Sequence, residues 1–117
     1  MFINLTNHPS ENWSAEQLEA ARQYGEIVDM PFPIIEPTFT KDDIQYLVKE
    51  CVEVIMGMKD ENTVVHVMGE MTFTHNLVNA LKEVGITCVA STTERLVKMT
   101  PDGKKVSEFK FVQFREY

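Results

Sequence analysis

Thr63-Val-Val-His-Val-Met-Gly-Glu-Met-Thr-Phe-Thr-His75 is the stretch that decides the fold. Its first half is a short, almost continuous apolar run, which is typical of a parallel strand covered on both faces, and Gly69 ends it. Apolar side chains then recur at helical spacing from Phe73 to Leu81. The stretch therefore predicts a strand, a tight turn that holds Glu70, and an amphipathic helix.

The turn matters because ligands of open α/β sheets bind at the carboxyl ends of the parallel strands. Gly69 is expected to let a ligand approach the backbone, and Thr72 or Thr74 is expected to cap the helix. Glu70 suits a ribose hydroxyl, a base amine or an acid–base role better than a bare phosphate. The alternative is that Glu70 only stabilises the start of the helix.

Length and composition restrict the class of protein. The chain has 117 residues, of which 44% are hydrophobic and 25% are charged, so we expect a single globular domain over residues 1–117. Because no apolar run is long enough to cross a bilayer and the first residues lack a signal-peptide pattern, we predict a cytoplasmic protein without a membrane partner. A net charge of -7 argues against binding to duplex nucleic acid.

Cofactor and metal motifs are absent from the sequence. It contains no P-loop, GxGxxG, CxxC or HExxH pattern, and Cys51 and Cys88 do not have metal-ligand spacing. The cysteines are interpreted as small buried hydrophobic residues of a reducing compartment. We therefore predict a protein without a metal or a cofactor.

The remaining elements alternate between strand and helix. Strand patterns begin at Phe2 and cover residues 26–29 and 86–90, while Ser14 and Thr40 each start a helix. Residues 96–114 predict a hairpin around an Asp-Gly turn. Because parallel crossovers are right-handed, this order predicts an α/β fold with a Rossmann-like parallel sheet of order 2-1-3-4 and a C-terminal antiparallel β-hairpin.

Three groups of polar residues follow strands one, three and four, so the topology predicts that they meet at one edge of the sheet. Among them, His8 and Glu70 are candidates for proton transfer, and Arg95 is the candidate for holding negative charge. The expected ligand contacts are Thr6, Asn7, Pro9, Ser10, Gly69, Met71, Thr72, Phe73, Ser91, Thr92 and Thr93. The alternative is a purely structural role, in which His8 is hydrogen-bonded within its own turn and Arg95 is paired with a neighbouring glutamate. His66 and His75, inside a strand and a helix, are interpreted as structural.

These features resemble a known group of proteins. An opening strand followed by Asn7-His8-Pro9, Gly69-Glu70 in the third crossover, Ser91-Thr92-Thr93-Glu94-Arg95 after strand four and a closing hairpin are similar to the small stand-alone proteins of type III CRISPR systems. Those proteins are related to the CRISPR-associated Rossmann fold. The resemblance covers nearly the whole chain.

The resemblance implies a function in antiviral defence. It implies that the protein binds a cyclic oligoadenylate second messenger in a homodimer, and that it cleaves this ligand as a metal-independent ring nuclease or sequesters it. In a ring nuclease, a ribose 2′-hydroxyl attacks the adjacent phosphate, with His8 and Glu70 moving protons and Arg95 stabilising charge.

Two other functions fit the residues. One is a regulatory or protein-interaction module without catalysis, which would tolerate Glu70→Ala. The other is a small enzyme that uses Glu70 as a base on a nucleoside or sugar and does not need a dimer.

Overall fold

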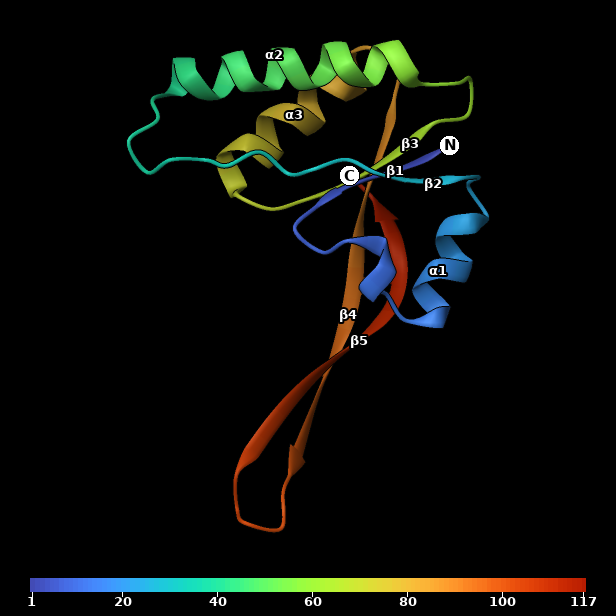
Figure 1. The fold of residues 1–117 in the computed structure, drawn as a ribbon, viewed down its shortest axis with the longest axis vertical. Coiled ribbons are helices and arrows are strands. Elements are labelled where there is room, and N and C mark those ends of the chain that lie inside the picture. The colour runs from blue at the N-terminus through green and yellow to red at the C-terminus, as the bar shows by residue number, and fades with distance from the viewer.

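The computed structural model describes residues 1–117 as a five-stranded sheet with helices on both faces (Figure 1). The elements follow the predicted order. They are β1 (Phe2–Thr6), a short 3-10 helix (Ser10–Asn12), α1 (Ala15–Arg22), β2 (Ile27–Asp29), α2 (Lys41–Met58), β3 (Val64–Met68), α3 (Met71–Glu83), β4 (Thr87–Met99) and β5 (Lys105–Glu116).

The sheet has the order β2-β1-β3-β4-β5, which confirms the predicted arrangement. Strands β1 to β4 pair in parallel, and β5 pairs with β4 in the antiparallel direction. In the centre, Asn4 of β1 lies opposite His66 of β3. The carboxyl ends of β1 and β3 therefore lie side by side, as the sequence predicted.

The two faces of the sheet bury different clusters. Helices α2 and α3 cover one face, where a cluster of 14 buried residues includes Leu5, Val65 and Phe73. Helix α1 lies on the opposite face, over a smaller cluster built on Phe2 and Val64. Because alternate side chains of a strand point to opposite faces, Val65 enters the first cluster while Val64 enters the second.

Helix starts follow the capping signals of the sequence. The Ser14 side chain accepts a hydrogen bond from the amide of Gln17, and Thr40 and Asp43 form a reciprocal capping box at the start of α2. The predicted cap of α3 by Thr72 or Thr74 is wrong, because the side chain of Glu70 occupies this role.

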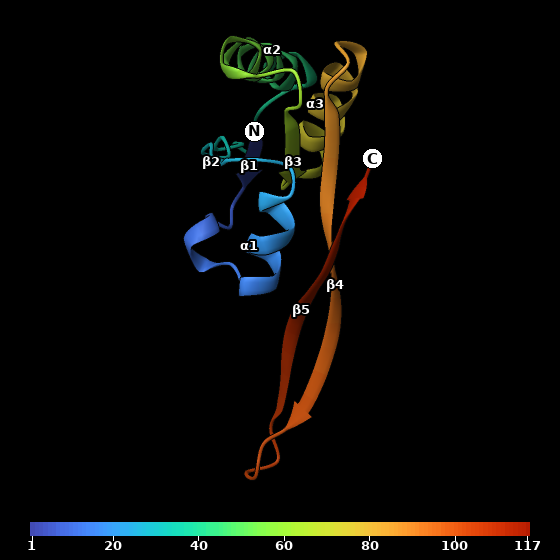
Figure 2. The ribbon, with the colours of Figure 1, turned by 90° about the vertical axis from the view of Figure 1, so that its right-hand side faces the viewer.

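The fourth strand is longer than predicted. Residues 91–95 were expected to form a polar loop after a strand at 86–90, but β4 runs without a break from Thr87 to Met99. The reason is that β5 pairs along its whole length, with one irregularity between Thr92 and Thr93. Beyond that irregularity the two strands leave the body of the protein as a hairpin, and we call residues 93–110 the arm (Figure 2).

The arm makes the molecule elongated, with extents of 51 × 37 × 21 Å. Its turn lies between Thr100 and Lys104, where the Thr100 amide donates to the Lys104 carbonyl and Gly103 has a φ of 84°. This turn confirms the Asp-Gly prediction. None of the helices has the combination of length and apolar character that crossing a membrane requires.

Candidate functional site

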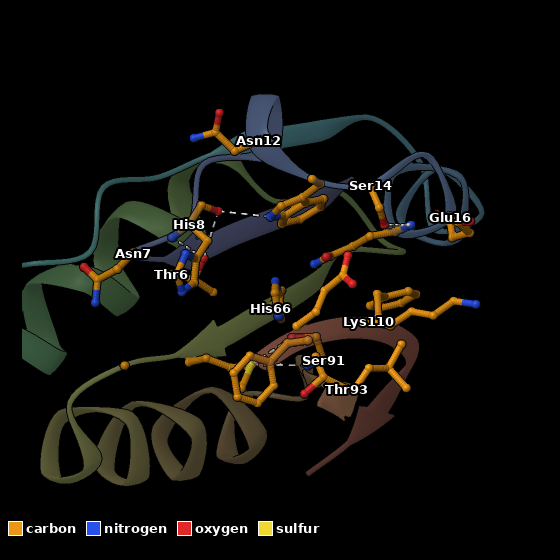
Figure 3. A pocket seen from close by; sticks show the side chains of 18 of the residues that line it. Thr6, Asn7, His8, Asn12, Ser14, Glu16, His66, Ser91, Thr93 and Lys110 are labelled. Carbon is orange, nitrogen blue, oxygen red and sulfur yellow. Dashed lines mark hydrogen bonds between the residues drawn. The ribbon is translucent and has the colours of Figure 1, made fainter. Parts of the chain in front are cut away.

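A cavity with a volume of about 1030 Å³ lies on the α1 face of the sheet. Its floor is formed by the ends of β1 and β3 and by β4. Residues 12–17, at the start of α1, form one wall, and the arm forms the other (Figure 3). The cavity thus lies at the switch point between β1 and β3, where the sequence placed a ligand site.

The structure brings a group of the predicted site residues to this cavity. They come from all three predicted groups, and they are Thr6, Asn7, His8, Gly69, Ser91 and Thr93. Among the three proposed catalytic residues, only His8 is in this group, where its side chain is exposed. His8 therefore remains available for contact with a ligand.

Other predicted site residues do not line the main cavity: Pro9, Ser10, Glu70, Met71, Thr72, Phe73, Thr92 and Arg95. Phe73 is fully buried in the core, where its ring packs edge-on against Phe32 with the centroids 5.3 Å apart. It is therefore not placed to stack on a base. Met71 lines a second, smaller cavity of about 470 Å³ beside α3.

Glu70 works as the cap of α3. Its carboxylate accepts hydrogen bonds from the amides of Thr72, at 3.1 Å, and Phe73, at 2.8 Å, and from the Thr72 hydroxyl. The hydrogen bond from the Phe73 amide, followed by that from the Thr72 hydroxyl, lowers the pKa of Glu70. This geometry corresponds to the alternative in which Glu70 stabilises a helix N-terminus.

Gly69 makes room for an aromatic ring. A Cβ atom at this position would collide with the ring of Phe32, which comes from the proline-rich segment before α2. The expected close approach to the Gly69 backbone is therefore made by a side chain of the protein itself.

Arg95 lies in the arm and bonds across it. Its Nε and Nη2 atoms donate to the Ser107 hydroxyl at 3.3 and 3.0 Å. The cationic side chains that line the cavity are instead Lys98 and Lys110, which the sequence reasoning did not select. Lys98 forms an ion pair with Glu108 at 3.2 Å.

His66, which the sequence suggested was structural, lines the cavity and is only 2% exposed. Its Nδ1 atom lies 3.1 Å from Asn4 Oδ1, whereas its Nε2 atom has no hydrogen-bond partner. Burial, followed by the nearby charge of His8, lowers the pKa of His66 to about 4. The imidazole is therefore neutral at physiological pH.

Asn4 connects His66 to a carboxylate. The Asn4 amide donates to Asp29 Oδ1 at 2.8 Å and to the His8 carbonyl at 2.9 Å. Burial raises the pKa of Asp29, but hydrogen bonds from Asn4 and Ser10 outweigh it, so the net direction is downward. We call Asp29, Asn4 and His66 the relay. The sequence could have indicated the relay only through the register of β1 and β3, because that register brings Asn4 beside His66.

Aromatic rings surround the relay histidine. The ring centroids of Phe114, Trp13 and Phe2 lie 5.1, 5.6 and 5.9 Å from that of His66. The Trp13 indole is held in place because its Nε1 atom donates to the His8 carbonyl at 3.1 Å. Trp13, Phe109 and Phe111 also line the cavity, so the site offers aromatic surfaces next to hydrogen-bonding groups.

This combination suits an organic ligand with flat rings, hydroxyl groups and negative charge. The aromatic side chains provide stacking surfaces, the relay provides an acceptor, and the lysines of the arm provide positive charge. No group of three or more His, Cys, Asp and Glu side chains is placed to hold a metal ion.

Comparison with known proteins gives a family. A family model described as "Uncharacterized protein MJ1673 family" matches residues 1–115. No curated protein and no solved structure matches the chain. Since the family match covers nearly the whole sequence, the chain belongs to the uncharacterized protein MJ1673 family.

Proposed function

We propose that this protein binds a cyclic oligoadenylate in the cavity between α1 and the arm, and that it degrades or sequesters this second messenger in type III CRISPR defence. The observation that carries the proposal is the composition of the cavity. A volume of about 1030 Å³ lies at the upper end of the range of about 300 to 1,000 Å³ typical of small-molecule sites, which suits a large ligand. Aromatic rings for bases and lysines for phosphates line the same space.

The lysines of the arm support the choice of an anionic ligand. Lys110 lines the cavity and has no ion-pair partner in the protein, so its charge is free to meet a phosphate. Glu16 and Glu108 also line the cavity. The proposed ligand must therefore place its phosphates toward the lysines and its hydroxyl groups toward the acidic side chains.

The positions of Glu70 and Arg95 favour sequestration of the ligand over its cleavage. Both side chains are engaged in bonds within the protein, Glu70 to the first turn of α3 and Arg95 to Ser107. His8 is then the remaining candidate for proton transfer among the residues that the sequence suggested. In this form of the proposal, the protein holds the ring tightly and turns it over slowly.

A homodimer is part of the proposal. The arm exposes apolar side chains, among them Met99 at 65% and Phe109 at 66%, and a ring with two-fold symmetry matches two copies related by a two-fold axis. Light scattering with and without ligand measures the assembly. A monomer under both conditions at micromolar concentration would contradict it.

The test of function is incubation of the protein with cyclic oligoadenylates of different ring sizes, followed by chromatography for products and calorimetry for binding. We expect binding of at least one ring. Lys110→Gln should weaken that binding about tenfold because it removes one charge-assisted contact, whereas Lys49→Gln, on the exposed surface of α2, should not. A parent protein that binds none of the rings would overturn the proposal and favour the interaction module.

The role of Glu70 is tested in the same assay. If Glu70 only caps α3, Glu70→Gln should lower the melting temperature by a few degrees and leave binding and product formation unchanged. If it transfers a proton, product formation should fall about 100-fold or more while binding persists.

A further inference from the structure

The relay ends in a buried atom that the protein itself leaves without a partner. His66 lines the cavity, and only 2% of the residue is exposed. Its Nε2 atom is buried and has no hydrogen-bond partner. Buried polar atoms in proteins are nearly always paired, and an exception indicates a ligand or water that completes the site. The unpaired nitrogen therefore points to a ligand independently of the cavity.

The hydrogen bonds of Asn4 determine which nitrogen of His66 carries the proton. The Asn4 amide nitrogen faces two acceptors, the Asp29 carboxylate and the His8 carbonyl, so its orientation is fixed. Asn4 Oδ1 must then point the other way, where it accepts from the Thr6 hydroxyl at 2.9 Å. The same oxygen faces His66 Nδ1, which must donate to it. In a neutral imidazole this leaves Nε2 as a free acceptor.

We propose that His66 Nε2 accepts a hydrogen bond from a ribose 2′-hydroxyl of the bound ligand, with Asn4 and Asp29 acting as positioning residues. The identity of the hydroxyl rests on the proposed function. An uncharged acceptor in an aromatic surround recognises a donor such as a hydroxyl and gives no attraction to phosphate. The site therefore distinguishes a ribonucleotide ring from a deoxyribonucleotide ring, a task that neither the lysines nor the aromatic surfaces perform.

The surroundings of His66 agree with this assignment. Its depressed pKa keeps the imidazole neutral, so the lone pair of Nε2 stays available at physiological pH. The Trp13 ring lies at 70° to the imidazole, with the ring centroids 5.6 Å apart. Nε2 is itself buried, so a hydroxyl reaches it only when the indole of Trp13, which lines the cavity and is partly buried, turns away from its hydrogen bond with the His8 carbonyl.

The first experiment tests the acceptor without a ligand. Nitrogen-15 chemical shifts of the imidazole report which nitrogen is protonated. At neutral pH we expect His66 to carry its proton on Nδ1 in the parent protein and to lose this preference in Asn4→Ala. A parent protein with the proton on Nε2 would overturn the assignment of the acceptor.

The second experiment measures discrimination as the ratio of affinities for a cyclic tetraadenylate and its fully 2′-deoxy analogue. We expect the parent to prefer the ribonucleotide by about 10- to 100-fold, because the deoxy ring leaves Nε2 unpaired. In His66→Phe the ratio should fall close to 1. Val89→Ala serves as the matched control, since Val89 lies opposite His66 in the register of β3 and β4 and is buried without lining the cavity, and it should keep the ratio of the parent.

The outcomes separate this inference from the proposed function. If the parent binds the ring and His66→Phe keeps the full preference for the ribonucleotide, the role of His66 is wrong and the proposed function stands. Equal binding of both rings by the parent also overturns the inference alone, and then a water fills the space at Nε2. If the parent binds no ring, the proposed function fails and the recognition of a ribose hydroxyl fails with it.

Discussion

The base and the arm of the β4–β5 hairpin are built from the same two strands, but they have opposite environments. At the base, Cys88 and Val89 of β4 are buried. Within the arm, β4 from Thr93 and β5 up to Lys110 are exposed almost throughout, and only Leu96 is partly covered. The base is stabilised by burial of apolar surface, whereas the arm relies on hydrogen bonds between two strands, which alone give little stability in water.

This difference assigns different tasks to the two regions. The base helps to hold the relay in a fixed geometry, because Phe114 of β5 packs against His66 beside the rings of Phe2 and Trp13. The arm contributes Lys98 and Lys110 to the cavity from a part of the molecule that has few packing constraints. We expect the rigid region to select the ligand and the exposed region to adjust to it.

The largest contrast should appear between Phe2, which packs against Phe114 at the base of the hairpin, and Phe109 in the arm. Phe2→Ala should lower the free energy of unfolding by about 3 to 5 kcal/mol, because it leaves a cavity in a fully buried cluster. Phe109→Ala, at a side chain 66% exposed in the arm, should change it by less than about 0.5 kcal/mol. Urea unfolding measures both costs, at a protein concentration low enough for light scattering to show a monomer. Similar costs would show that the arm is covered in solution.

A pH dependence of stability should reveal the buried His66, which packs against Phe114 at the base of the hairpin. The pKa of His66 is lowered from 6.5 to about 4, so between these values the unfolded chain binds a proton that the folded chain does not. Stability is therefore complete above pH 6.5 and falls toward pH 4, by about 1.4 kcal/mol per pH unit and about 3 kcal/mol in total. The neighbouring Asp29, whose pKa is also lowered, contributes only below this window.

Urea unfolding at pH 7 and at pH 4.5 checks this expectation. His66→Phe should remove most of the fall, whereas His75→Gln, at an exposed position of α3, should keep it. A fall of the same size in His66→Phe would mean that other groups cause it.

A third comparison is between Gly69 and Gly57, which both lie outside the arm. Gly69→Ala should lower the free energy of unfolding by about 1 to 3 kcal/mol, because the new methyl group collides with Phe32. Gly57→Ala should raise it by about 0.5 to 1 kcal/mol, since Gly57 lies inside α2 with no neighbour near the new atom. In the background of Phe32→Leu, the cost of Gly69→Ala should shrink. An unchanged cost would exclude the collision as its cause.

Local signals in the sequence were sufficient to predict the order of the elements. Ser14 and Thr40 marked helix starts through side chains that bond to backbone only a few residues away, and Gly103 marked the turn of the hairpin. Hydrophobic periodicity and the handedness of crossovers then predicted the order of the strands. The capping and turn signals work because each depends on contacts that are close in sequence, and the handedness rule then restricts how strands joined by one helix can be ordered.

The features that the sequence did not predict depend on distant partners. Residues 91–95 are polar and were interpreted as a loop, but β5 supplies the hydrogen bonds that keep them in a strand. His66 acquires its relay only through Asn4, 62 residues away in the chain. Lys98 and Lys110 reach the cavity because of the path of the arm, which no local pattern of residues specifies.

The smallest effect is expected in the arm itself. Lys98 and Glu108 form an ion pair at 3.2 Å, but their side chains are 69% and 59% exposed, so water and salt screen the attraction. A double-mutant cycle with Lys98→Ala and Glu108→Ala should give a coupling of less than about 0.5 kcal/mol in the free energy of unfolding, and less again in 0.5 M salt, a concentration of about three times the physiological ionic strength. Because both side chains line the cavity, the same cycle measured on ligand affinity should give a larger coupling than the one on stability, since a bound ligand removes water from the pair. Equal couplings in the two measurements would show that the pair stays in contact with water when the ligand is bound.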